Sequence, residues 1–257
     1  MRLDLFLFEN GYAKSRTEAK NLIVSGSVKI SGKPVTKPSF EIEDGEGLEI
    51  RKDASKYVSR GGYKLEGALI AFDVNPEGKL CIDIGASSGG FTDCLLQNGA
   101  ERVIAVDSGT MQLAESLRQD ERVIVRESFN ARYMSREDFE FVPNLAVMDV
   151  SFISATYIIP AIFDLLSENS DFICLVKPQF EVGRSLLGKG GIVKNEKHRK
   201  MALDKVVEFA KITGFEYINY TDSPITGGDG NREYLVHFKK CGKENYDEKH
   251  IDNSEQK

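Results

Sequence analysis

The chain has 257 residues, of which 41% are hydrophobic and 29% are charged, as in an ordinary globular protein. Its formal net charge is −6 and its pI is about 5.3, which argues against a protein that binds nucleic acid over its whole surface. Residues 1–40 differ, because they hold seven Lys or Arg and three acids, a net charge of +4. A local basic face of this kind can bind phosphates on an acidic protein.

No apolar run approaches the roughly 20 residues that span a membrane. We expect no secretory signal at Met1–Phe6, because the apolar stretch there is short and contains an acid. The sequence therefore predicts a cytoplasmic protein without membrane contact. The four cysteines form no close pair and are expected to be reduced: Cys81, Cys94, Cys174 and Cys241. The three histidines lack metal-ligand spacing, so no metal site is predicted.

Residues 1–50 are predicted to form a small α+β domain. A first helix carries apolar residues from Leu3 to Leu7 on one face. The run Ser15–Glu18 is typical of a capping box that starts a second helix, and Gly26 suits the end of that helix. Residues 28–35 have the pattern of a β-hairpin.

Residues 51–62 are polar, basic and glycine-containing, and we expect them to be an interdomain linker. Strand-like and helical runs then alternate from residue 63 to residue 240. Strands are expected at 80–84, 102–107, 123–126, 145–150, 171–177, 215–220 and 233–239, and helices at 64–72, 90–98, 111–118, 154–166 and 197–213.

This alternation predicts a Rossmann-like α/β domain with a mostly parallel sheet of seven strands. The last strand is expected to be antiparallel, because only a short loop, 222–232, joins it to the strand before. Residues 241–257 are polar without periodicity and are expected to form a disordered tail.

The run Lys79–Thr92 indicates a nucleoside-cofactor site. A short apolar strand ends in an acid and is followed by a Gly/Ser turn, where bare backbone N–H groups can face a ligand. Asp107 ends the next strand, where an acid can bind both hydroxyls of a ribose. The turn has Ser87 at the second glycine of a dinucleotide fingerprint, which favours S-adenosyl-methionine over NAD, since the former has no phosphate. A structural turn without a ligand is the alternative.

The predicted contacts of this cofactor come from the turn and from the ends of the following strands. Asn130 is the candidate for the adenine, and Asp149 is expected nearest the sulfonium. The full set is Asp83, Gly85, Ala86, Ser87, Gly89, Gly90, Phe91, Asp107, Asn130 and Asp149.

Four charged residues are candidates for catalysis, because each begins or ends an element at the edge of the sheet where ligands bind. They are Lys64, Asp149, Lys177 and Glu233. Two lysines and two carboxylates can form a neutral cluster that aligns a hydroxyl for attack. Taken singly, Asp149 could be a helix N-cap and Lys177 a surface lysine.

Two parts of the chain resemble known families. The segments Arg2–Asp4, Gly11–Tyr12 and Ser15–Ala19 resemble the S-four-type RNA-binding domain. The remainder is similar to FtsJ-type 2′-O-ribose RNA methyltransferases, on the runs 83–92, 149–154, 177–183 and 230–234. Joined by Val58–Leu65, the two parts resemble the TlyA family of ribosomal RNA cytidine methyltransferases, historically labelled haemolysin A, over residues 2–239.

The resemblance implies a methyltransferase fold and methyl transfer from S-adenosyl-methionine to the ribose 2′-OH of a cytidine in ribosomal RNA. It also implies that Lys64, Asp149, Lys177 and Glu233 form a Lys-Asp-Lys-Glu catalytic tetrad and that no metal is required. The expected partner is ribosomal RNA or a ribosomal subunit, and the oligomeric state is left open.

Basic residues on both parts are candidates for RNA phosphates, with a solvated surface as the alternative for each. The loop Glu181–Val193 is expected to be a mobile lid that touches phosphate. The candidates are Arg2, Lys14, Arg16, Lys20, Arg60, Arg184 and Lys189.

Two other functions remain open at this point. One is a membrane-active haemolysin, against which the lack of a membrane span argues. The other is methylation of a different RNA or of a base. An amino-group base methyltransferase would carry an Asn/Asp-Pro-Pro-aromatic turn, which Asp149–Phe152 does not match.

Overall fold

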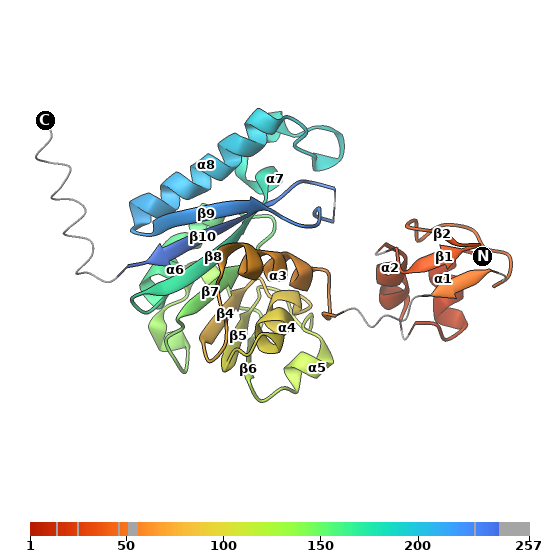
Figure 1. Cartoon of the computed structure of the whole chain (residues 1–257), viewed down its shortest axis with the longest axis horizontal. Helices are drawn as coiled ribbons and strands as arrows, with labels where there is room; N and C mark the ends of the chain where they lie inside the picture. Colours follow the sequence, from red (N-terminus) through yellow and green to blue (C-terminus); the bar gives the residue numbers. More distant parts are fainter. Residues whose placement is uncertain (14, 25, 46, 51–55, 229, 242–257) are drawn as a thin grey trace, which may run out of the picture. The chain divides into compact units, whose positions relative to one another are not determined.

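Figure 1 shows the computed structural model, which describes residues 1–13, 15–24, 26–45, 47–50, 56–228 and 230–241. The chain divides into two compact units, Met1–Lys56 and Tyr57–Lys257, and each is described here by itself. Residues 51–55 of the expected linker and 242–257 of the expected tail lie outside the described residues.

The first unit packs two helices on a small antiparallel sheet. Ser15 Oγ accepts the N–H of Glu18 (3.1 Å) at the start of the second helix, as expected of a cap. Its buried core includes Leu3, Leu7, Ile23 and Val28. The elements are α1 (Leu3–Glu9), α2 (Arg16–Val24), β1 (Val28–Ile30), β2 (Lys33–Pro34) and β3 (Leu48–Ile50), with strand order β2-β1-β3.

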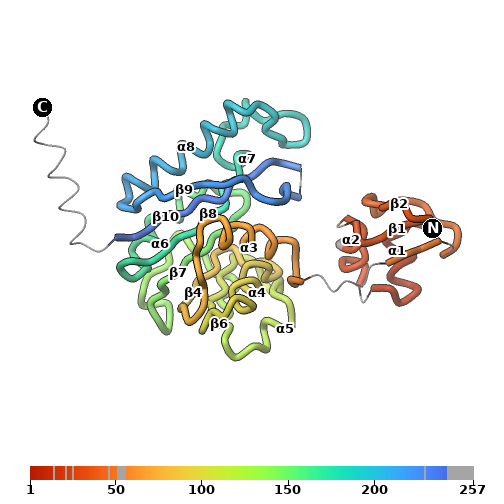
Figure 2. Tube along the Cα trace, viewed as in Figure 1, coloured from red at the N-terminus to blue at the C-terminus, as the bar shows by residue number. Residues whose placement is uncertain are grey.

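The second unit is built on a seven-stranded sheet with the order β6-β5-β4-β7-β8-β10-β9, whose strands are all labelled in Figure 1. The Cα trace in Figure 2 shows β4, β7 and β8 side by side in this order. β10 is antiparallel to both of its neighbours, and the remaining pairs are parallel. The predicted mostly parallel sheet with an antiparallel last strand is thereby confirmed. The strands are β4 (Leu80–Ile84), β5 (Arg102–Val106), β6 (Val123–Arg126), β7 (Leu145–Met148), β8 (Ser170–Val176), β9 (Glu216–Asp222) and β10 (Tyr234–Lys240).

Helices cover both faces of this sheet. They are α3 (Gly61–Phe72), α4 (Gly90–Gln97), α5 (Glu115–Arg118), α6 (Ile159–Leu165), α7 (Pro178–Glu181) and α8 (Glu196–Thr213), with the 3-10 turns η1 (Ala131–Tyr133), η2 (Arg136–Asp138), η3 (Ala155–Tyr157), η4 (Arg184–Leu186) and η5 (Lys189–Gly191).

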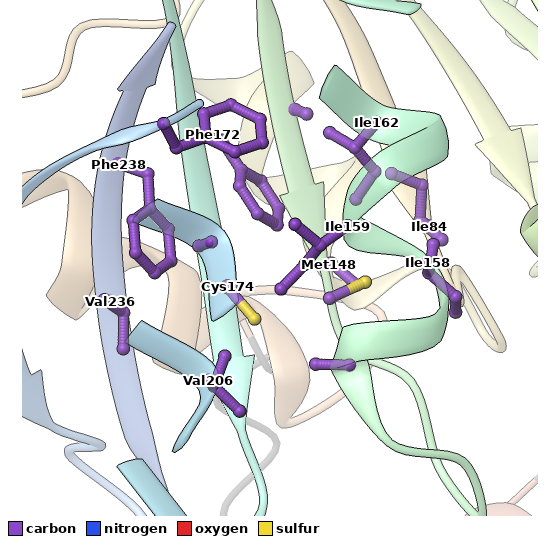
Figure 3. Packing of buried hydrophobic residues seen from close by; sticks show 14 of the residues in the cluster. Ile84, Met148, Ile158, Ile159, Ile162, Phe172, Cys174, Val206, Val236 and Phe238 are labelled. Carbon is purple, nitrogen blue, oxygen red and sulfur yellow. The ribbon is translucent and has the colours of Figure 1, made fainter. Parts of the chain in front are cut away.

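Each face has its own hydrophobic core. On one face, residues of α6 and α8 pack on the strands, and Figure 3 shows Ile159, Ile162 and Val206 gathered with Phe172 and Phe238. The rings of Phe172 and Phe238 stack across the β8–β10 pair with centroids 5.6 Å apart. On the other face, α3 and α4 cover the same strands. Burial on both faces explains why the strands read as continuous apolar runs.

Two predicted helices differ from the structure. In the expected helix 111–118, only Glu115–Arg118 is helical, because the backbone of Met111 is left-handed (φ +53°) and that of Ala114 is extended (φ −56°, ψ 139°). The expected helix 154–166 is split into η3 and α6. Pro160 sits in the first turn of α6, where its missing N–H costs least.

The segment from Tyr57 to Gly62, which we expected in the linker, packs on the second unit. Tyr57 is 1% exposed and its ring lies edge-on to that of Tyr63, with centroids 5.3 Å apart. The N–H of Val58 donates to the Asp93 carboxylate of α4 (2.7 Å). The division between the two units therefore falls after Lys56.

Gly62 is predicted to be required for this packing. A Cβ at Gly62 would overlap the Tyr57 side chain, so Gly62→Ala should lower the free energy of unfolding of the second unit by about 1–3 kcal/mol through overpacking. Gly228→Ala is the matched control, because a Cβ there meets nothing within 4 Å. Urea unfolding of both variants measures the difference, and equal stability would contradict the packing.

A charged cluster lies near the amino ends of the parallel strands. It links Lys79, which precedes β4, to Asp171 on β8 and His237 on β10. Asp171 accepts from Lys79 Nζ (2.6 Å) and lies 3.0 Å from His237 Nε2. Burial alone would raise the pKa of Asp171, but hydrogen bonds from His237 and Lys79 outweigh it and lower the pKa to about 2.

Asp171→Asn is predicted to destabilise the protein in a pH-dependent way. The folded-state pKa lies below the ordinary value of 3.8, so the carboxylate stabilises the fold above that value by on the order of 2 kcal/mol. This contribution is lost as the pH falls toward 2. Urea midpoints of wild type and variant, measured from pH 7 to pH 3, should converge on acidification; a constant gap would contradict the prediction.

Candidate active site

A cavity of about 450 Å³ opens at the carboxyl ends of β4, β5 and β7. The strand order reverses between β4 and β7, and ligands of open α/β sheets bind outside such a reversal. A volume of this size suits a nucleoside-sized ligand. The lining residues are Ile84, Gly85, Ser87, Val106, Asp107, Ser108, Gly109, Gln112, Phe129, Asn130, Ala131, Asp149, Val150, Ser151, Phe152, Ile153 and Ile158.

Five of the ten predicted cofactor contacts line this cavity: Gly85, Ser87, Asp107, Asn130 and Asp149. Gly85 has φ +83°, and a Cβ there would overlap the backbone carbonyl of Asp149, so glycine lets β4 and β7 approach closely. The Asp107 carboxylate accepts the N–H of Ser87 (2.8 Å) and that of Gly109 (2.7 Å). Each of its oxygens keeps a second lone pair for a ligand hydroxyl.

The other five predicted contacts do not line the cavity, and each of them packs against other parts of the second unit. Phe91 and Ala86 are buried in the α3–α4 core. A Cβ at Gly89 would overlap Leu117, and one at Gly90 would overlap Ser59 Oγ.

Asp83, the fifth of these, is fully buried beneath the turn. It accepts from Thr92 Oγ1 (2.7 Å), and burial raises its pKa to about 7. These five residues therefore shape the turn from behind.

Lys64 and Glu233 form the first of two ion pairs among the predicted catalytic residues. Lys64 Nζ lies 2.6 Å from Glu233 Oε2. Lys64 stands on α3 and is 8% exposed, whereas Glu233 directly precedes β10 and is 3% exposed. The small residue Gly227 makes room for the carboxylate, because a Cβ there would overlap Glu233 Oε1.

Asp149 and Lys177 form the second ion pair. Lys177 Nζ lies 2.6 Å from Asp149 Oδ1 and donates to Ser151 Oγ (2.7 Å). Asp149 and Ser151 line the cavity, so this pair is at its wall. Sequence reasoning gave Ser151 no role; its place in the run after β7 was the available signal.

The sheet register brings the two ion pairs to one edge. Tyr234 of β10 is opposite Val176 of β8, so Glu233 and Lys177 both lie one step beyond that pair at the same end. Met148 of β7 ends beside Cys174, which puts Asp149 at the same edge. The four predicted catalytic residues thus gather at the carboxyl ends of the parallel strands.

Glu181 was missed by sequence reasoning, although it lies four residues after Lys177. Its carboxylate accepts from Ser154 Oγ (2.6 Å), Ala155 N–H (2.7 Å) and Lys205 Nζ (3.0 Å). These bonds tie α7, which follows Lys177, to η3, which follows Asp149. Glu181 therefore holds together the two segments that carry the second ion pair.

The predicted RNA contacts lie on both units of the chain. In the first unit, Arg2 and Arg16 both bond to the buried Asp4 carboxylate, and the Arg2 hydrogen bond lowers the pKa of Asp4 to about 2. Lys20 is exposed nearby on α2, and Lys14 lies outside the described residues. In the second unit, Arg60 is exposed before α3, and Arg184 and Lys189 are exposed in the loop after α7.

That loop is anchored at its far end by Asn231, another residue without a predicted role. Asn231 is 1% exposed; its Oδ1 accepts the N–H of Val193 (2.9 Å) and its amide donates to the Gly191 carbonyl (3.1 Å). Glu233 is two residues after Asn231. Asn231 therefore holds both the end of this loop and the backbone that leads to the Lys64–Glu233 ion pair.

Comparison with protein families matches both units. Residues 57–240 match the FtsJ-like methyltransferase family, and residues 1–48 match the S4 domain. The first match covers well over half of the chain and includes the cavity and both ion pairs.

Individual relatives match over nearly the whole chain. "Hemolysin A" of Brachyspira hyodysenteriae is 44% identical, covering 93% of this chain and 99% of that protein. "16S/23S rRNA (cytidine-2'-O)-methyltransferase TlyA" of Mycobacterium tuberculosis is 42% identical, covering 91% and 88%. A solved structure from Streptococcus thermophilus, also named a hemolysin, has a TM-score of 0.75 at 44% identity and covers 94% and 88%. The chain belongs to the TlyA, or hemolysin A, family of FtsJ-like methyltransferases that carry an S4 domain.

Proposed function

We propose that this protein transfers a methyl group from S-adenosyl-methionine to the ribose 2′-OH of a cytidine in ribosomal RNA. The observation that carries the proposal is the Lys177–Asp149 ion pair in the wall of a nucleoside-sized cavity, with Lys64–Glu233 at the same edge. The family membership supports the reaction type, and the relatives named for cytidine 2′-O-methylation support the substrate.

The cavity has the size of a nucleoside ligand and both polar and apolar lining residues, which suits S-adenosyl-methionine. In this proposal Asp107 binds the ribose hydroxyls and Asn130 the adenine, while the methionyl end lies beside Gly85 and Asp149. When bound, S-adenosyl-methionine would supply a methyl group whose carbon is bonded to a positively charged sulfur. An oxygen nucleophile can attack that carbon, and the thioether leaves. The Asp149 carboxylate matches that charge.

The second ion pair is proposed to handle the 2′-OH. Lys177 Nζ, between Asp149 and Ser151, orients the hydroxyl at the cavity wall. The hydroxyl proton would pass to this pair as the oxygen bonds to the methyl carbon and the bond from that carbon to sulfur breaks. Lys64 and Glu233 neutralise each other and keep this edge ordered. Holding the hydroxyl in line supplies much of the remaining acceleration.

RNA is proposed to bind through basic residues on both parts of the chain. We propose an RNA-binding domain at 1–50 and a methyltransferase domain at 57–240, with the S4 match supporting the first and the FtsJ-like match the second. Exposed cations are suited to phosphate contact without sequence preference. The candidates within the described residues are Arg2, Arg16, Lys20, Arg60, Arg184 and Lys189.

A membrane-active function has little support beyond the name that some relatives carry. Within the described residues, every helix is too short or too polar to cross a bilayer. Methylation of another RNA is an outcome of the test below, since the site geometry concerns the ribose and not the sequence around it.

Lys177→Ala is expected to abolish methyl transfer to ribosomal RNA while S-adenosyl-methionine still binds. Loss of general-base assistance typically lowers a rate by about 10²–10⁴-fold. The full chain is incubated with unmethylated ribosomal RNA and labelled S-adenosyl-methionine, and 2′-O-methyl ribose is mapped.

Lys79→Ala is the matched control for this experiment. It removes a lysine whose ion pair has the same 2.6 Å separation but lies at the other edge of the sheet. Wild-type turnover by Lys177→Ala would refute the role of that lysine, and label in another RNA but not in ribosomal RNA would refute the substrate.

Asp107→Asn is expected to weaken S-adenosyl-methionine binding by about 10- to 100-fold, because hydrogen bonds to a charged group are worth about 1.5–3 kcal/mol. Calorimetric titration with S-adenosyl-methionine measures the change. Asp120→Asn, which removes an acid paired with Arg122 outside the cavity lining, should bind like wild type. An unchanged affinity in Asp107→Asn would move the ribose contact elsewhere.

A further inference from the structure

Two exposed tyrosines flank one arginine beside the cavity. The guanidinium carbon of Arg132 lies 4.9 Å from the ring centroid of Tyr157 and 5.6 Å from that of Tyr133. Tyr133 is 71% exposed and Tyr157 is 54% exposed, so both rings offer most of a face to solvent. Tyrosine is usually more buried than this.

These three residues, which we call the Tyr133–Arg132–Tyr157 cluster, each lie within two positions along the chain of a residue that lines the cavity. η1 begins at Ala131, directly after Asn130, and both residues line the cavity. Asn130 Oδ1 also accepts the N–H of Arg132 (3.1 Å). Tyr157 ends η3, between the lining residues Ile153 and Ile158. The cluster is therefore joined through short backbone segments to the proposed adenine contact and to the segment after Asp149.

Arg132 also keeps its charge free for a ligand. Within the described part of the chain, no carboxylate pairs with its guanidinium. The three arginines immediately before it along the chain each pair with an acid: Arg118 with Glu127, Arg122 with Asp120 and Arg126 with Glu140. The next arginine, Arg136, donates hydrogen bonds from its guanidinium to the carbonyls of Asp164 and Leu166 at the end of α6.

We propose that the Tyr133–Arg132–Tyr157 cluster is a stacking platform for unpaired RNA nucleotides next to the methylated one, with Arg132 binding their phosphate. The proposal rests on the proposed function and extends it from the reacting ribose to its neighbours. Aromatic faces bind bases with little sequence preference, and an unpaired arginine beside them matches the backbone charge. A 2′-OH can reach the cavity wall only where RNA is locally unpaired, so its neighbours are available for stacking.

The test compares RNA binding by full-length variants, using fluorescence anisotropy with a fluorescein-labelled oligocytidylate of 12 nucleotides. Tyr157→Ala and Tyr133→Ala should each weaken binding by about 5- to 150-fold, the range for loss of one base–aromatic stack. Tyr157→Phe should bind like wild type, because it keeps the ring. A chain of 12 abasic ribose phosphates should bind wild type and Tyr157→Ala equally.

Tyr220→Ala is the matched control. Tyr220 is also an exposed tyrosine with a cation over its ring, Lys200 at 4.7 Å, but it stands on β9 at the other side of the sheet. Its loss should leave RNA binding unchanged. Calorimetry with S-adenosyl-methionine checks that each variant retains the folded cavity.

The outcomes separate this proposal from the proposed function. Wild-type RNA affinity in both tyrosine variants would overturn the platform, even if the protein methylates RNA. Weaker binding in Arg132→Ala alone would also overturn it, since that result describes a phosphate contact without stacking. If wild type transfers no methyl group to RNA yet the tyrosine variants lose binding, the platform stands and the proposed reaction fails.

Discussion

The buried ion pair between Lys64 and Glu233 is the constraint on which the edge of the sheet with the proposed catalytic residues depends. Its partners are 169 positions apart in the chain, on α3 and at the start of β10. Two charges removed from water are costly unless each satisfies the other, and loss of one strands its partner. The pair therefore requires that α3 cover the sheet and that β10 enter it beside β8. Once these are in place, the same edge carries Lys177, Asp149 and the cavity.

Asp149 and Lys177, which form the second ion pair at this edge, are held in place by different interactions. Asp149 and the Gly85 turn are fixed by parallel strands whose cores are closed on both faces, so their backbone has little freedom. Lys177 is fixed by hydrogen bonds instead, since Glu181 ties the segment after it to the segment after Asp149. Placing reactive groups on such supported segments is how a rigid scaffold presents chemistry.

Particular elements show where sequence reasoning succeeded and where it failed. The strands β4 and β6 have the predicted bounds, because a strand buried on both faces is a continuous apolar run. The helix expected at 111–118 begins only at Glu115, because the backbone of Met111 is left-handed and that of Ala114 is extended. Gly89 and Gly90 are predicted cofactor contacts, and the structure shows in addition that Leu117 and Ser59 leave no room for a Cβ at these positions. A sequence does not distinguish a glycine required for packing from a glycine required for a ligand.

The sequence by itself determined the fold class, the Gly/Ser turn, and the identities of the four charged residues, because local propensity and motif spacing are properties of the chain. Only the tertiary structure decided which lysine pairs with which carboxylate, since the order of strands in a sheet is set by long-range packing. The tertiary structure likewise places Arg132 against the rings of both Tyr133 and Tyr157, a contact that the spacing of these residues in the sequence does not predict. Contacts between distant segments form only when the whole core closes, and that physical step is absent from any local pattern.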